Sequence, residues 1–402
     1  MVTACEGGSG GAAPGQAGGG SGAQTGGPAG ARARGNPADP ESVGPQIGRV
    51  AEGERGQFWL STTPLGATGR CVELPTLDTQ LAQLLLVGFP GTTAGAVSRG
   101  LVDRGIGGLL LFRGNVVSAG QVKALVAALK GRADIPLEVA VDQEPGTRVA
   151  RLRGIVRASP AARDLGRLPA DQVERYGRAT GRDLAALGIT ADLAPVLDVT
   201  GARRDGVIGD RSFGPDPATV SRAAVAWRRG LAAGGVAAVG KHFPGHGATT
   251  VDSHQLLPVV EASPARLRDH ELVPFRAAIR AGLDAVMVGH LVVRAVDPER
   301  PATLSPAVVG GLLRGRMGFD GLVVSDALEM GAIAGTLSLP VAAERALAAG
   351  IDQLTLSGHA QVAAILDHLA KAVAAGRLSR ARVREAFLHV QRFKRVGRWS
   401  GC

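Results

Sequence analysis

The chain has 402 residues, of which 45% are apolar and 20% are charged, so it can bury a large core as one big domain or two ordinary ones. Its net charge of +10 is carried by scattered arginines, and its aromatic residues (Phe 9, Trp 3, Tyr 1) do not alternate with a basic run, which argues against nucleic-acid binding. A protein at an anionic cell envelope would explain the charge equally well. The cysteines Cys5, Cys71 and Cys402 have no CxxC spacing, and they indicate neither a disulfide framework nor a zinc ribbon.

Residues 1–70 are predicted to form a disordered tether, because their Gly, Ala, Ser and Pro composition has no apolar periodicity. The alternative is an appendage loosely attached to the folded domain. The start "VTAC" is similar to the end of a bacterial lipoprotein signal, in which Cys5 would carry the lipid. The basic and apolar parts of such a signal are missing and would have to precede Met1. The sequence as numbered predicts no transmembrane helix.

After residue 70, short apolar runs alternate with amphipathic segments such as "QVKALVAALK" and "VAAERALAAG". Near-continuous apolar runs are typical of parallel strands that are buried on both faces. We therefore predict a single (β/α)8 barrel over residues 71–402, with a doubly wound open sheet as the alternative. The eight predicted strands lie in residues 84–90, 105–112, 137–144, 189–199, 236–243, 285–290, 321–328 and 352–357.

Polar residues stand where five of these runs end. They are Asp142, Asp198, Lys241 with His242, His290 and Asp326. Catalytic groups of (β/α)8 barrels gather on the loops at the C-terminal ends of the strands, so we expect these side chains to meet at one mouth of the barrel. A single Asp at a strand end is more often a helix cap or a loop anchor, but five repeats of the same placement weaken that interpretation.

Two segments suggest particular chemistry. Asp326, in "GLVVSDALEMGA", comes directly after a run of buried residues and is either a structural acceptor or a nucleophile. The triplet Asp252-Ser253-His254 lies in the loop after the fifth predicted strand. An Asp placed two residues before a His can orient the imidazole for proton transfer, although an ordinary Asx-type turn beside an exposed His is an equally simple interpretation.

A metal site formed by His242, His246 and His254 is the rival interpretation of "KHFPGHGATTVDSH". Zinc sites favour His pairs spaced i, i+4 on a helix, and the Pro and Gly residues of this segment interrupt any helix. Lys241 is also an unfavourable neighbour for a dication. We therefore expect no metal and no other cofactor.

The segments "VDQEPGTRVARL", "IGDRSFGPDP", "KHFPGHGATTVDSH", "HELVPF" and "GLVVSDALEMGA" together resemble glycoside hydrolase family 3, specifically its single-domain bacterial β-N-acetylhexosaminidases. The resemblance covers about residues 75–395. It implies retaining cleavage of terminal β-linked N-acetylglucosamine, with Asp326 as the nucleophile, His254 as the acid/base and Asp252 as the partner of His254.

The same resemblance implies the sugar-binding residues Asp142, Arg151, Arg211, Lys241 and His242. The chain departs from the family at "DQEPGTRV", where the usual motif reads "DQEGGRV". A Pro and one extra residue in this loop put the placement of Arg151 in doubt, because they can displace the residues on the C-terminal side of the loop.

Three alternatives to this activity stay open. Two-domain β-glucosidases of the family lack the "DSH" element and need more chain after Asp326 than is present here, so they fit poorly. A phosphorylase with the same site is compatible with a His acid/base. A silent sugar-binding lipoprotein would not need Asp326, Asp252 and His254 together. We expect a monomer at the cell envelope, anchored outside the membrane through Cys5, acting on peptidoglycan fragments (muropeptides) or chitooligosaccharides and binding no nucleic acid.

Overall fold

The computed structural model describes residues 73–201, 207–249, 253 and 256–399, which belong to one compact unit of the chain. The predictions for residues 1–70, including lipidation of Cys5, lie outside the described residues. Eight parallel strands form the main sheet: β1 (Leu85–Gly88), β2 (Gly108–Leu111), β3 (Glu138–Val141), β4 (Ala191–Asp192), β5 (Ala237–Phe243), β7 (Ala285–Val288), β10 (Leu322–Ser325) and β11 (Leu354–Leu356).

The order of the strands follows the chain around a ring. The sheet runs β10-β7-β5-β4-β3-β2-β1-β11, and each neighbouring pair is parallel. Its two ends meet where the Ser325 amide donates to the Gln353 carbonyl at 2.9 Å and the Gln353 amide donates to the Val323 carbonyl at 3.1 Å. This closure confirms the predicted (β/α)8 barrel. The doubly wound alternative is wrong, because such a sheet reverses its strand order and stays open.

Strand β4 is shorter than its predicted run. Only Ala191–Asp192 pair as a strand, although the apolar run extends over residues 189–199. Pro195 has no N–H to donate to a ladder, so it ends regular pairing in a central strand. A single bridge between Val196 and Lys241 keeps the segment beside β5. The irregular stretch carries Asp198 to the C-terminal rim of the barrel.

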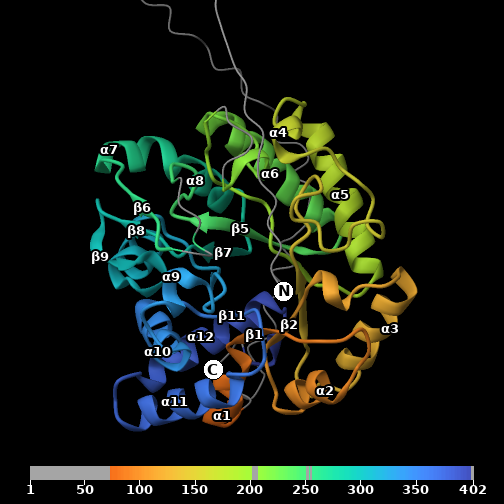
Figure 1. The fold of residues 1–402 in the computed structure, drawn as a ribbon, viewed down its shortest axis with the longest axis vertical. Coiled ribbons are helices and arrows are strands. Elements are labelled where there is room, and N and C mark those ends of the chain that lie inside the picture. The colour runs from red at the N-terminus through yellow and green to blue at the C-terminus, as the bar shows by residue number, and fades with distance from the viewer. Residues whose placement is uncertain (1–72, 202–206, 250–252, 254–255, 400–402) are drawn as a thin grey trace, which may run out of the picture. The chain divides into compact units, whose positions relative to one another are not determined.

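Twelve α-helices among the described residues accompany the strands, and Figure 1 shows most of them arranged around the central sheet. Side chains of Ser118, Asp216 and Ser379 cap helices α3, α6 and α12 by accepting a bond from the backbone N–H three residues further on. The helices are α1 (Leu77–Gln83), α2 (Ala96–Asp103), α3 (Ala119–Lys130), α4 (Ala162–Leu165), α5 (Ala170–Ala186), α6 (Pro217–Ala233), α7 (Pro264–Arg266), α8 (Val273–Arg280), α9 (Gly331–Ala334), α10 (Leu339–Ala349), α11 (Val362–Ala374) and α12 (Arg380–Phe393).

Short elements fill the connections. A small sheet has the order β6-β8-β9, with β6 at Val259–Val260, β8 at Val292–Val293 and β9 at Asp297–Pro301. The 3₁₀ turn η2 (Gly209–Arg211) precedes α6, and the π-helical segment η5 (Ala307–Arg316) takes the place of the helix between β7 and β10. None of the helices in the described part of the chain combines the length and the apolar character that a membrane crossing requires.

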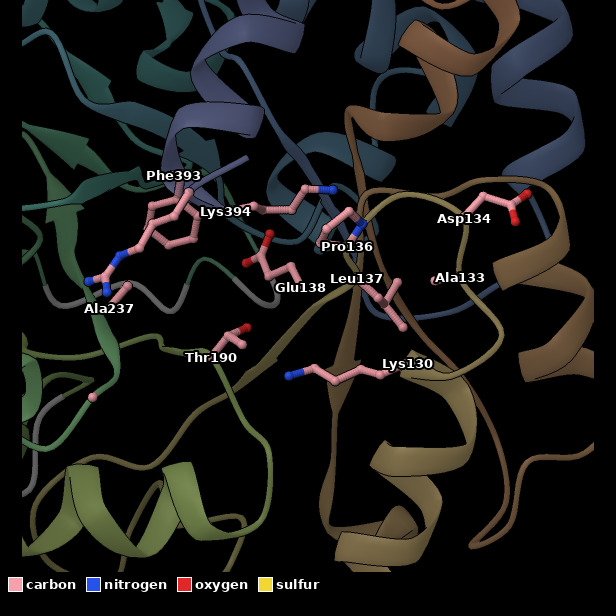
Figure 2. A pocket seen from close by; sticks show the side chains of 12 residues that line it. Lys130, Ala133, Asp134, Pro136, Leu137, Glu138, Thr190, Ala237, Phe393 and Lys394 are labelled. Atoms are coloured by element: carbon pink, nitrogen blue, oxygen red, sulfur yellow. The ribbon is translucent and has the colours of Figure 1, made fainter. Parts of the chain in front are cut away.

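Two cavities open at opposite ends of the barrel. One, of about 400 Å³, lies at the C-terminal ends of the strands and includes Asp142 and Asp326 in its wall. The other, of about 490 Å³, lies at the N-terminal ends, where Glu138 begins β3 and Ala237 begins β5. Figure 2 shows this second cavity, with the side chains of Lys130, Glu138 and Lys394 around it.

Candidate active site

Six residues predicted from the sequence line the cavity at the C-terminal end. They are Asp142, Arg151, Arg211, Lys241, His242 and Asp326. They come from the loops after β3 and β10, from η2 and from the end of β5, so segments far apart in the chain converge on one mouth. Four of them, Asp142, Lys241, His242 and Asp326, stand at predicted strand ends and do meet at one mouth, as the strand-end pattern predicts. The chemical roles of all six stay predictions.

Asp326 comes directly after β10 and borders the cavity. Its backbone N–H donates to the Val288 carbonyl at 3.0 Å, and its Oδ1 accepts a bond from the Ala327 N–H at 2.8 Å. Burial acts to raise the pKa of Asp326, but the nearby His242 and His290 outweigh it, and the pKa lies below its usual value. The carboxylate is therefore ionised at neutral pH and held by the backbone, as a nucleophile requires.

Lys241 and Arg211 lie in a buried cluster with two carboxylates. Lys241 Nζ donates to Asp142 Oδ1 at 2.7 Å and lies 2.7 Å from Glu144 Oε1. Arg211 donates to both oxygens of Glu144, through Nε at 2.8 Å and Nη2 at 2.7 Å. Burial raises the pKa of Glu144, but Arg211 and Lys241 reverse the effect and hold it well below its usual range. The cluster fixes two cations at the wall of the cavity.

His242 is oriented by Asp198. The Asp198 Oδ2 lies 2.7 Å from His242 Nδ1, and Asp198 Oδ1 accepts the backbone N–H of His246 at 2.7 Å. Asp198 is fully buried, which raises its pKa, but His242 opposes this and the pKa is lowered. An ionised Asp198 makes Nδ1 the protonated nitrogen, so His242 offers Nε2 for a ligand in the cavity.

His246 also lies at the cavity but is held by hydroxyl groups. Its Nδ1 is 2.6 Å from Thr249 Oγ1, and its Nε2 is 3.2 Å from Ser253 Oγ. Burial, aided by His242, lowers the pKa of His246, so the ring is neutral at neutral pH. These contacts with Thr249 and Ser253 hold the ring in place and indicate a structural role for His246.

The loop with the unusual "DQEPGT" sequence keeps Arg151 at the cavity. The Glu144 N–H donates to the Val149 carbonyl at 2.8 Å, and the Arg151 N–H donates to the Asp142 carbonyl at 3.1 Å, so a tight hairpin absorbs the extra residue. The Arg151 guanidinium lies over the Phe112 ring at 5.7 Å. Arg148 pairs with Asp210 at 3.5 Å. Arg151 thus lies at the cavity despite the extra residue, and its role in sugar binding stays a prediction.

The proposed acid/base pair, Asp252 and His254, lies outside the described residues. Ser253, between them, is buried and lines the cavity. Its carbonyl accepts the Ala332 N–H at 3.2 Å, which ties it to helix α9 beyond Asp326. Within the described ranges no group of three His, Cys, Asp or Glu residues is arranged to hold a metal ion.

Three further residues shape this end of the barrel without a predicted role. Asp198 and His290 stand at predicted strand ends, and His290 bonds Thr303 Oγ1 at 2.7 Å and the Ala327 carbonyl at 2.9 Å beside Asp326. The placement of Asp198 and His290 at predicted strand ends is the sequence signal that points to both residues. Glu144 is the third, and no spacing in the sequence points to its partners, because Arg211 and Lys241 come from different elements.

The (β/α)8 barrel and the charged groups at its C-terminal mouth fit a glycoside hydrolase, and the family match establishes this class. The chain belongs to glycosyl hydrolase family 3, because residues 76–393 match the profile described as the family's N terminal domain.

The relatives support this assignment. The chain is 40% identical over 333 residues to "Beta-hexosaminidase LpqI" of Mycobacterium tuberculosis, a match that covers 80% of this chain and 83% of the relative. The solved structure of M. tuberculosis LpqI has a TM-score of 0.75 at 38% identity, covering 81% of this chain and 97% of that one. A family 3 β-N-acetylglucosaminidase from Paenibacillus sp. has a TM-score of 0.78 at 39% identity over 81% of this chain, which spans only 63% of that protein.

Proposed function

We propose that the protein is a retaining exo-β-N-acetylglucosaminidase. The observation that carries this proposal is the ionised, backbone-held Asp326 at a cavity whose wall presents Asp142, Lys241 and Arg211. A cavity of about 400 Å³ suits one sugar ring and its acetamide, since small-ligand sites start at roughly 300 Å³. The relatives named β-hexosaminidase and β-N-acetylglucosaminidase support the choice of sugar.

The reaction has two steps. A carboxylate oxygen of Asp326 attacks the anomeric carbon, the bond to the leaving oxygen breaks, and a glycosyl ester forms with inversion. Water then attacks the same carbon from the opposite side and releases Asp326, so the configuration is retained overall. The Ala327 N–H holds Oδ1 at 2.8 Å, which leaves Oδ2 for the attack.

The wall of the cavity positions the sugar. An ionised Asp142 accepts from sugar hydroxyls, whereas Lys241, Arg211 and Arg151 donate to hydroxyls or to the acetamide oxygen. His242, oriented by Asp198 through its Nδ1, adds its Nε2 to the cavity that Asp326 also lines. These contacts fix the ring so that its anomeric carbon faces Asp326.

His254, assisted by Asp252, supplies the proton. In the first step it protonates the leaving oxygen, and in the second it removes a proton from the attacking water, so it ends as it began. This assignment rests on the family resemblance. The position of Ser253 at the cavity supports it, because Ser253 is the residue between the two.

We further propose that the substrates are peptidoglycan fragments, with chitooligosaccharides fitting the same pocket. The support is indirect: a net charge of +10 favours the anionic cell envelope, and "VTAC" suggests a lipid on Cys5 outside the membrane. The role would then be turnover of the cell wall.

The test compares release of p-nitrophenol from the β-N-acetylglucosaminide and the β-glucoside, with EDTA-treated protein, with and without phosphate. Selective cleavage of the aminosugar without phosphate is the expected result. Cleavage that depends on phosphate would make the protein a phosphorylase. No cleavage of either compound by folded protein would contradict the proposal and favour a barrel that only binds sugar.

A further inference from the structure

Glu144 lies beneath the sugar-binding wall and touches two of its cations at once. Its side chain is almost completely buried, at 1% exposure, and Glu144 is not among the residues that line the cavity. One oxygen, Oε1, lies 2.7 Å from Lys241 Nζ and accepts a hydrogen bond from Arg211 Nη2 at 2.7 Å. The other oxygen, Oε2, accepts a hydrogen bond from Arg211 Nε at 2.8 Å. A single carboxylate thus joins the end of β5 to η2.

The charges of this cluster balance only with Glu144 in place. Lys241 and Arg211 carry two positive charges in a region shielded from water, and Asp142 and Glu144 carry two negative ones. Asp192 also faces the cluster, but burial raises its pKa well above the usual value, which disfavours a further negative charge there. Buried charges require such pairing, because an unpaired ion loses its hydration without compensation.

Glu144 also limits which hydrogens of Lys241 and Arg211 are left for a ligand. Lys241 has three ammonium hydrogens, and its contacts with Asp142 and Glu144 use two of them. The fork of Arg211 contacts Glu144 through Nε and Nη2, so Glu144 does not use Nη1 of this cavity-lining side chain. The remaining donors of both cations thus belong to side chains held by a residue that does not line the cavity.

The backbone around Glu144 is held independently of the cations. The Gln143 N–H donates to Asp192 Oδ1 at 2.9 Å, and Gln143 Oε1 accepts the Leu152 N–H at 2.9 Å. Together with the bond from the Glu144 N–H to the Val149 carbonyl, these bonds hold the backbone of the hairpin in place.

We propose that Glu144 is the positioning residue that aims Lys241 and Arg211 at the bound aminosugar. This inference rests on the proposed function, because it takes the cavity to be the sugar site.

The experiment uses Glu144→Asp and Glu144→Gln in the full chain, with Glu138→Gln as the matched control. Glu138 is another buried glutamate, but it lies at the opposite end of the barrel. Glu144→Asp keeps the charge and withdraws the oxygens by one methylene, so it cannot reach both cations. We expect its inhibition constant for N-acetylglucosamine and its KM to rise about tenfold or more, with kcat changed much less. The control keeps wild-type values.

A pH profile separates positioning from mere stabilisation. Burial acts to lower the pKa of Lys241, but Asp142 and Glu144 outweigh it and the pKa is raised, with Arg211 opposing them. Asp192, His242 with Asp198, and Asp326 are the other charged or titratable groups nearby. Glu144→Gln removes one counter-ion, so the pKa of Lys241 should fall. The alkaline limb of N-acetylglucosamine binding, which needs no proton transfer from His254, should then move to lower pH. Glu138→Gln should leave that limb in place.

The inference would be overturned if both Glu144 variants fold, bind N-acetylglucosamine like the wild type and leave the alkaline limb unchanged. A crystal structure of the wild type with N-acetylglucosamine tests it even if the variants do not fold. We expect Lys241 Nζ and Arg211 Nη1 to contact the sugar while both keep Glu144, and a sugar that touches neither donor would overturn it. A wild type that neither binds nor cleaves the aminosugar would instead refute the proposed function.

Discussion

The two ends of the barrel each bury a glutamate beside cations, but the two carboxyl groups behave in opposite ways. At the C-terminal end, Arg211 and Lys241 contact Glu144 directly and keep it ionised. At the N-terminal end, burial raises the pKa of Glu138 to about 7, and the opposing influences are weaker: an amide bond from Gln353 at 2.7 Å and the charge of Lys394. Glu144 at the C-terminal end therefore keeps its charge, whereas Glu138 at the N-terminal end changes its charge near neutral pH.

The comparison also shows that volume alone does not locate the site. The N-terminal cavity, at about 490 Å³, and the C-terminal one, at about 400 Å³, are similar in size. Lys394 Nζ there donates to Gln83 Oε1 at 2.6 Å, and Lys130 Nζ donates to the Gly188 carbonyl at 2.6 Å, which are contacts that hold helices to the barrel. In (β/α)8 barrels the N-terminal face serves stability and the C-terminal face serves catalysis.

The largest predicted difference between the ends comes from Asp326→Ala. Without the carboxylate no glycosyl ester can form, so kcat should fall by about 10⁴-fold or more. Thermal melting should change little, because Asp326 borders the cavity. Steady-state kinetics and a melting curve on the same sample measure both. Activity near that of the wild type would remove Asp326 from the reaction.

Replacing His254 by Ala should have a large effect that depends on the substrate. Loss of acid assistance should slow cleavage of a disaccharide by about 10²- to 10⁴-fold, whereas an activated aryl glycoside, whose leaving group needs no proton, should lose less in its glycosylation step. Comparing kcat/KM for the two substrates measures this. Equal losses on both would count against His254 as the acid.

Asp142→Asn removes the charge of one residue in the cavity wall while nearly keeping the shape of its side chain, so it tests whether this wall binds the sugar. A hydrogen bond to a charged group contributes about 1.5–3 kcal/mol, so KM should rise by about 10- to 100-fold while the fold is retained. Lys241 keeps Glu144 as its counter-ion in this variant. The inhibition constant for N-acetylglucosamine should rise in parallel, and an unchanged constant would place the sugar elsewhere.

Glu138→Gln should have the smallest effect on activity, with kcat/KM within about twofold of the wild type. Its effect is on stability. Because the pKa of Glu138 rises from 4.5 in the unfolded chain to about 7 in the fold, the folded state binds more protons between these values, and the wild type loses stability as the pH rises through this window. The variant lacks this loss.

Between pH 5 and pH 8, the free energy of unfolding of the variant should therefore rise relative to that of the wild type by up to about 3 kcal/mol. Denaturant unfolding at both pH values measures the difference. A large drop in kcat/KM for a folded Glu138→Gln protein would break the contrast between the two ends.

Much of the fold was readable from the sequence, because buried parallel strands leave continuous apolar runs. All eight runs contain a barrel strand, and the polar residues at their ends mark the mouth. The early end of β4 was missed, since the run continues through Pro195. The contacts of Glu144 and the hold of Asp198 on His242 could not be predicted, because they depend on side chains that only the closed barrel brings together.

The most direct test of the account is to trap the covalent intermediate. The wild type is reacted with a 5-fluoro-N-acetylglucosaminyl fluoride, which is expected to form the glycosyl ester faster than water removes it, and is then denatured, digested and analysed by mass spectrometry. We predict one aminosugar adduct, on the peptide that contains Asp326, and none in Asp326→Ala. An adduct on another carboxylate, or continued turnover without any adduct, would contradict the account.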